Sequence, residues 1–136
     1  MKTSELRIGN LVYSQKEMEN GDPIPVLVIG IDTQHITYLS EKYELHSEVR
    51  PFQVLPKQIY PIPLSKIWLD KFGFEDYFLP LPGNGELEIR LHDGSFHIWS
   101  AEGQTESNNY SHPITGIHQL QNLYFALTAE ELSINK

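Results

Sequence analysis

The chain has 136 residues, of which 40% are hydrophobic and 21% are charged, the size and composition of an ordinary globular domain. It contains no cysteine, which excludes a disulfide framework, thiolate metal sites and a cysteine nucleophile. The net charge is -8, and no lysine or arginine occurs between Leu91 and Asn135, so this stretch lacks the cations that neutralise nucleic-acid phosphates. No stretch has the length of a signal-peptide core or of a membrane span, and we therefore expect a cytoplasmic protein without a membrane partner.

The N-terminal half, up to about residue 60, has the pattern of short β strands. LRIGNLVYS is an extended stretch interrupted at Gly9-Asn10, a pair that tolerates positive φ. PVLVIGID (Pro25–Asp32) is apolar at nearly every position, which is typical of a strand covered on both faces, and the following ITYLS completes a hairpin. Pro51 predicts an edge strand or a bend in VRPFQVLP, and the polar QKEMENGD predicts a loop. Short strands with tight turns predict a small curled, SH3-like barrel.

A short helix over Lys66–Phe72 has both of its ends encoded in PIPLSKIWLDKFGFE. Ser65 is placed as the N-cap, where its hydroxyl accepts from a free amide of the first turn. Gly73 fits the left-handed position after the helix, with Phe74 folding back onto Leu69.

ELEIRLHDGSFHIWS predicts a hairpin around Asp93-Gly94, a favoured type I′ turn. The two-residue loop fixes the register of both strands, and YFLPLP adds a third strand that Pro80 confines to an edge. Alternation gives an apolar face of Leu87, Ile89, Leu91, Phe96 and Ile98. The other face, expected in water, carries Glu86, Glu88, Arg90, His92, His97 and Trp99. The polar stretch Glu102–Thr115 predicts a surface loop.

GIHQLQNLYFALTAEEL predicts a C-terminal helix with an apolar arc of Ile117, Leu120, Leu123, Tyr124 and Leu127. The opposite side carries Phe125 among polar residues, which a single buried stripe does not explain. In one interpretation the helix is sandwiched between the hairpin and the N-terminal half. In the other, His118, Asn122 and Phe125 form an exposed stripe for a protein partner or a second copy of the chain. TAEE, from Thr128, has the pattern of a capping box and predicts a further short helix.

Together these elements predict an α+β fold: a small N-terminal antiparallel β-barrel-like (SH3-like) half, then a helix, an antiparallel β-meander and the C-terminal helix. Residues 1–60 are the expected β-rich subdomain and residues 61–136 the α+β subdomain. We expect them to share one core, because neither is large enough to bury a sizeable core alone.

Three stretches, ELRIGNLVY, PIPLSKIWLDKFGFE and IHQLQNLYFALTAEEL, resemble in this order an uncharacterised family of short bacterial proteins that are often carried on prophages and other mobile elements. No activity, cofactor or catalytic residue is assigned to that family, so the resemblance transfers no functional residue. It implies a bacterial or phage accessory protein that is intracellular and is not a metabolic enzyme.

Motifs for catalysis are absent from the sequence, which has neither a G-x-S-x-G nucleophile elbow nor an H-E-x-x-H metal motif, and we expect no cofactor. His92 and His97 are diagonal neighbours on the predicted hairpin and are weak candidates for a metal pair. A third ligand would come from Glu86, Glu88 or His112.

The leading hypothesis is therefore a non-catalytic protein-interaction protein that binds another protein or itself. Its candidate contact residues are Phe125, His118, Asn122, Trp99, Arg90 and His97. One alternative is a small enzyme or metal-dependent protein that uses the histidine-bearing hairpin face. Another is nucleic-acid binding by the N-terminal β half and its neighbours, through Arg7, Arg50, Lys57, Lys66 and Lys71.

Overall fold

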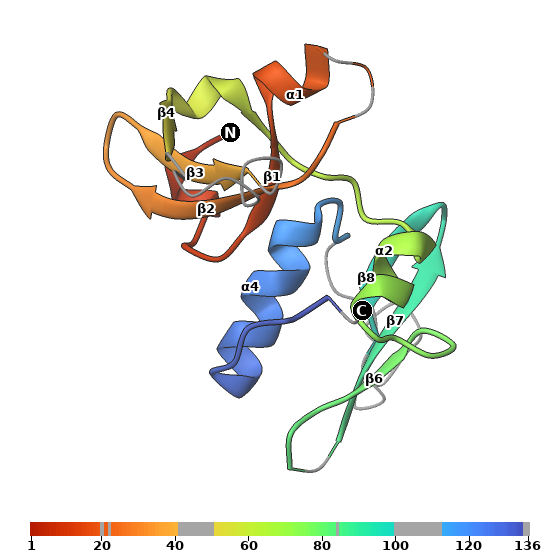
Figure 1. Ribbon diagram of the computed structural model, residues 1–136. Coiled ribbons are helices and arrows are strands. Elements are labelled where there is room, and N and C mark those ends of the chain that lie inside the picture. The colour runs from red at the N-terminus through yellow and green to blue at the C-terminus, as the bar shows by residue number, and fades with distance from the viewer. Residues whose placement is uncertain (20, 22, 41–50, 84, 100–112, 135–136) are drawn as a thin grey trace. The chain divides into compact units, whose positions relative to one another are not determined.

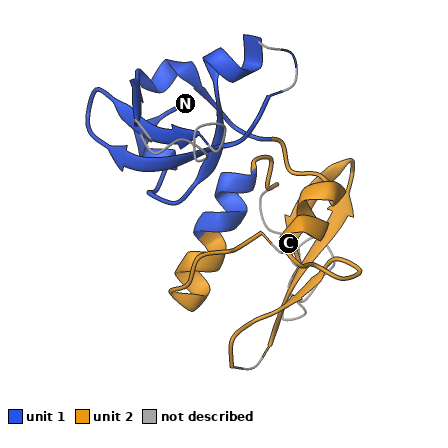
Figure 2. Cartoon of the chain, viewed as in Figure 1, with its two compact units in different colours: residues 1–62, 117–122 blue, residues 63–116, 123–136 orange. Residues whose placement is uncertain are grey.

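The computed structural model describes residues 1–19, 21, 23–40, 51–83, 85–99 and 113–134. The chain divides into two compact units, coloured separately in Figure 2. The first unit comprises Met1–Ile62 and Ile117–Asn122, and the second comprises Pro63–Gly116 and Leu123–Lys136. The C-terminal helix is thus divided between the two units, which the expected single boundary at residue 60 does not include.

The first unit is built on a five-stranded antiparallel sheet that curls into a half-barrel, as the sequence predicts (Figure 1). Its strands in chain order are β1 (Leu11–Ser14), β2 (Val26–Ile31), β3 (Ile36–Ser40), β4 (Phe52–Val54) and β5 (Ile59–Tyr60). The spatial order is β4-β3-β2-β1-β5, so that β1 pairs with both β2 and β5. The strand that follows Pro51 lies at an edge of the sheet, as expected. Proline has no N–H to donate to a neighbouring strand, and an edge strand has a neighbour on one side only.

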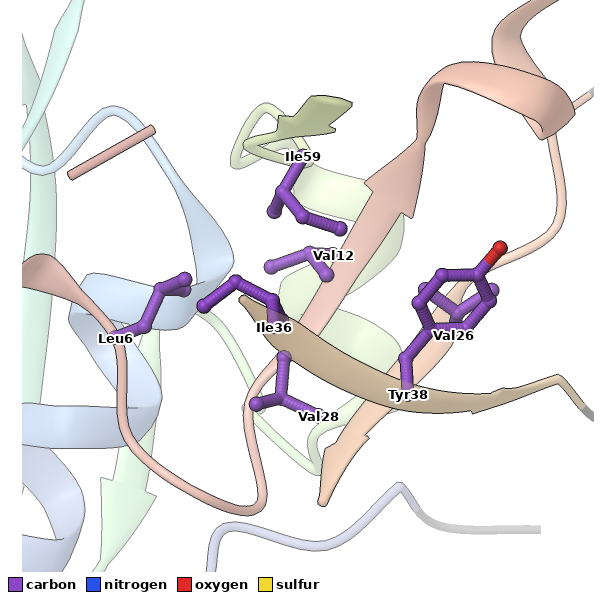
Figure 3. Close-up of a cluster of buried hydrophobic side chains, with 7 residues drawn as sticks. All are labelled: Leu6, Val12, Val26, Val28, Ile36, Tyr38 and Ile59. Atoms are coloured by element: carbon purple, nitrogen blue, oxygen red, sulfur yellow. The ribbon is translucent and has the colours of Figure 1, made fainter. Parts of the chain in front are cut away.

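The core of the first unit lies on one face of this sheet (Figure 3). Alternate strand residues point into it, because successive side chains in a strand lie on opposite faces. Its buried members are Leu6, Val12, Val26, Val28, Ile36, Tyr38 and Ile59. The expectation that the second strand is covered on both faces is wrong for Leu27, whose side chain is 38% exposed between the buried Val26 and Val28.

A short helix, α1 (Gln15–Glu19), occupies most of the stretch for which the sequence predicts a loop. The Ser14 hydroxyl accepts a hydrogen bond from the Glu17 amide at 3.3 Å, which satisfies a first-turn donor in the manner of an N-cap. Lysine, glutamate and methionine are good helix formers, and with this cap they outweigh the polarity that suggests a loop.

The second unit begins with helix α2 (Lys66–Lys71), whose ends confirm the sequence prediction. The Ser65 hydroxyl accepts from the Trp68 amide at 3.4 Å. At the other end Gly73 has φ 92°, and the Phe74 amide donates to the Leu69 carbonyl at 3.0 Å. This bond is the long-range one of a Schellman motif, which requires a left-handed residue where glycine stands.

The hairpin of the second unit is also confirmed, with strands β7 (Glu86–His92) and β8 (Ser95–Ile98). Asp93 and Gly94 have φ of 50° and 77°, as a type I′ turn requires, and Arg90 lies opposite His97. The third strand, β6 (Phe78–Pro80), pairs with β7. The expected apolar face is buried at the end of the hairpin that is distant from the turn, but Leu91 near the turn is 58% exposed.

The C-terminal helix α4 spans Ile117–Thr128. The predicted further helix at TAEE is wrong: residues 129–134 contain no helix, and Ala129 reverses the chain with φ 58°. Thr128 closes the helix instead of opening one, because its hydroxyl donates to the Tyr124 carbonyl at 2.8 Å and accepts from the Glu130 amide at 3.1 Å. Among the described residues, no helix combines the length and apolarity needed to cross a membrane.

Candidate functional site

The polar side of the first half of α4 is bound to the N-terminal segment of the first unit. The Gln121 side chain spans two backbone groups there, since its Oε1 accepts from the Leu11 amide at 2.9 Å and its Nε2 donates to the Gly9 carbonyl at 3.2 Å. The neighbouring groups, the Gly9 amide and the Asn10 carbonyl, are bonded to Val28 of β2. The Leu11 amide and the Gly9 carbonyl are therefore left without a partner in β2. Strand β5, the other neighbour of β1, pairs only with Tyr13 and Ser14. Gln121 satisfies this part of the sheet edge.

Asn122 completes the attachment. Its Oδ1 accepts from Asn10 Nδ2 at 2.8 Å and from Arg7 Nε at 3.3 Å, and its Nδ2 donates to the Glu5 carbonyl at 3.2 Å. Asn10 in turn holds the Gly9-Asn10 turn, because its Oδ1 accepts from the Arg7 amide at 2.7 Å. The polar residues of the helix thus serve the fold of the first unit.

The expected surface stripe of His118, Asn122 and Phe125 is not present as one exposed strip. His118 is 4% exposed and Asn122 is engaged as described, whereas Phe125 is 38% exposed and Leu127 is 55% exposed. The helical projection separates polar from apolar residues, but it contains no information on which polar residues find partners elsewhere in the chain. Of the three candidates, Phe125 is the one that the structure leaves at the surface.

The remaining candidates, Trp99, Arg90 and His97, lie half-buried on the polar face of the β6-β7-β8 meander. The expectation that this whole face lies in water is wrong for Glu88, whose side chain is 14% exposed, and for the Trp99 Nε1 atom, which is buried. The register places Phe78 of β6 beside Glu88 of β7, and the Trp99 amide donates to the Glu88 carbonyl at 3.0 Å. Residues opposite one another in an antiparallel pair share a face, so Phe78, Glu88 and Trp99 form a row across the sheet. The Arg90 guanidinium lies 3.6 Å from the centre of the Trp99 ring and pairs with the Glu88 carboxylate.

The two hairpin histidines are neighbours, as expected. The ring centres of His92 and His97 are 5.9 Å apart, and His92 Nε2 lies 3.3 Å from an Asp93 carboxylate oxygen. No group of three metal-binding side chains forms among the residues that the structure describes. His112, the sequence candidate for a third ligand, is outside those residues.

A hollow of about 350 Å³ opens beside this row, and sequence reasoning did not find it. It is lined by Glu75, Asp76, Phe78, Pro80 and Glu86. Asp76 and Tyr77 form a tight turn with φ of 49° and 70°, across which Glu75 and Phe78 exchange hydrogen bonds of 2.8 and 2.9 Å. The pairing of Pro80 with Glu86 brings the other side of the hollow into place.

The hollow is acidic and partly aromatic. No cation among the described residues pairs with the carboxylates of Glu75, Asp76 and Glu86, and Phe78 is 38% exposed. The sequence signal was present in the acidic residues on either side of YFLPLP, but only the register of β6 against β7 brings them together.

No protein-family model, curated protein or solved structure matches the chain. The membership in the prophage-associated family that the sequence resembles therefore stays a prediction.

Proposed function

We propose that the protein is a non-catalytic accessory protein, of bacterial or phage origin, that binds another protein through the polar face of its β6-β7-β8 meander. The observation that supports this is the cross-strand row in which Arg90 is stacked on Trp99 and Phe78 is exposed beside a hollow. Tryptophan and arginine are enriched among the residues that dominate binding at protein interfaces, and the hollow beside Phe78, at the other end of the row, offers room for an anchoring side chain.

The charge of this face indicates the chemistry of the partner. Arg90 is paired with Glu88, so the charge that faces the hollow comes from Glu75, Asp76 and Glu86. A lysine or arginine side chain of the partner would meet these carboxylates and the face of Phe78, a combination that favours cations. The net charge of -8 would also steer a basic partner toward the chain.

A peptide-binding titration tests this proposal. Fluorescence anisotropy would measure the affinity of a labelled lysine-rich peptide, with a glutamate-rich peptide of equal length as the negative control. The double variant Glu75→Gln/Glu86→Gln should weaken binding of the lysine-rich peptide by roughly twofold to thirtyfold, because each exposed charge contact contributes about 0.2–1 kcal/mol. Phe78→Ala should weaken it further through the lost cation–π contact.

The matched control is Glu19→Gln/Glu130→Gln, which changes the net charge equally but lies outside the hollow. An equal loss of affinity in both double variants would mean that the peptide responds to overall charge, and the proposed site would be wrong. Capture from a bacterial lysate, with and without nuclease, would then identify the natural partner. A capture that disappears with nuclease would favour the nucleic-acid alternative.

A further inference from the structure

His118 is a buried titratable group that lies within the attachment of α4 to the N-terminal segment. Its side chain is 4% exposed, and its Nδ1 atom is buried without a hydrogen-bond partner among the described residues. Gln121 and Asn122, three and four residues further along the same helix, make the bonds that hold the segment Glu5–Leu11. A change in the charge of His118 therefore acts at the position where these bonds are made.

Burial disfavours a positive charge on His118, and the nearby Glu5 carboxylate opposes this effect. Residues 117–122 of α4 contain no other titratable side chain, and strand β1 contains no charged one. The segment Glu5–Leu11 contributes the two charged residues Glu5 and Arg7. Arg7 donates to Asn122, and among the described residues the carboxylate of Glu5 is the charged group that favours an imidazolium at His118.

We infer that the attachment of α4 to the segment Glu5–Leu11 is an acid-sensitive latch, which is closed while His118 is neutral and opens when its imidazole takes up a second proton. Opening means that the side-chain bonds of Gln121 and Asn122 break while the rest of the chain stays folded. An imidazolium in this position has a buried N–H at Nδ1 that finds no acceptor among the described residues, and local separation of the helix from the segment gives it water.

The direction of the pH dependence follows from linkage. Burial lowers the pKa of His118 below its usual value of 6.5, and the nearby Glu5 carboxylate opposes this in part. The open form, in which the imidazole is hydrated, binds a proton at higher pH than the closed form. The closed form is therefore fully favoured above pH 6.5 and loses stability as the pH falls below it, until the folded-state pKa is passed.

Hydrogen exchange of single amides in the full chain tests the latch. The Leu11 amide donates to Gln121 Oε1, so its protection reports opening directly, and the Phe74 amide, bonded to Leu69 in the second unit, is the internal reference. Between pH 7.5 and pH 5.5 the Leu11 protection factor should fall by up to about tenfold per pH unit below 6.5, the limit for uptake of one proton. Protection of Phe74 should stay constant.

The matched variants are His118→Leu, which stays neutral, and His35→Gln, which removes a histidine from the β2-β3 turn. The first should abolish the pH dependence at Leu11 and the second should keep it. Should His118→Leu fail to fold, an NMR titration of the wild-type imidazole replaces it, with an expected pKa below 6.5. Constant protection of Leu11, an equal fall at Phe74, or titration of His118 at or above 6.5 would each overturn the inference.

Discussion

Gln121→Met tests the interpretation that the polar side of α4 is structural. Methionine matches glutamine in length and in helix propensity, so the substitution removes the two hydrogen bonds and little else. The Leu11 amide and the Gly9 carbonyl lose their partner, and both contacts are partly buried. Leaving a buried backbone group unsatisfied costs about 1–3 kcal/mol, and the lower part of that range applies to partly buried groups. We expect a loss of about 2–3 kcal/mol in the free energy of unfolding.

Urea denaturation followed by far-UV circular dichroism would measure this loss. In a thermal melt, the melting temperature should fall by roughly 6–15 °C, because a loss of 1 kcal/mol corresponds to about 3–5 °C for a chain of this size. Gln34→Met is the control, because Gln34 is exposed in the turn between β2 and β3 and uses its backbone amide for its bond to Asp32. A surface substitution of this kind changes stability by at most about 0.5 kcal/mol. Equal stability of the two variants would refute the assignment of Gln121 to the sheet edge.

Two further predictions concern the local signals of the second unit. Ser65→Ala removes the side-chain acceptor of the Trp68 amide and should lower the free energy of unfolding by about 1 kcal/mol. Ser65→Asp should retain most of the stability that the cap contributes, because aspartate is also a favoured N-cap residue. Thermal melts of both variants would show whether the cap contributes. Gly94→Ala should cost about 1–2 kcal/mol, because its φ of 77° disfavours a side chain although a Cβ there meets nothing within 4 Å. Gly94→Asn should cost less, since asparagine tolerates this conformation, and equal melting temperatures for alanine and asparagine would contradict a backbone origin.

The sequence determined those parts of the fold that depend on neighbours in the chain. The α2 helix has its cap at Ser65 and its stop at Gly73 within one short stretch, and both signals act over a few residues. The hairpin register follows from Asp93-Gly94, because a two-residue loop leaves one way to pair the strands. The α+β class and the half-barrel could be predicted for the same reason: short strands, tight turns and amphipathic periods are local patterns.

Three features could not be predicted from these local patterns, and the tertiary structure decided them. The side of α4 on which polar residues are buried depends on Gln121 and Asn122 meeting residues more than 100 positions away. The acidic hollow depends on the register of β6 against β7, which assembles side chains from a turn and two strands. The end of α4 depends on Thr128 bonding back to Tyr124, although the same residue begins a sequence with the pattern of a helix start. A helical projection or a capping pattern gives the spacing of side chains along one element, whereas burial and hydrogen bonding depend on what the rest of the chain brings against it.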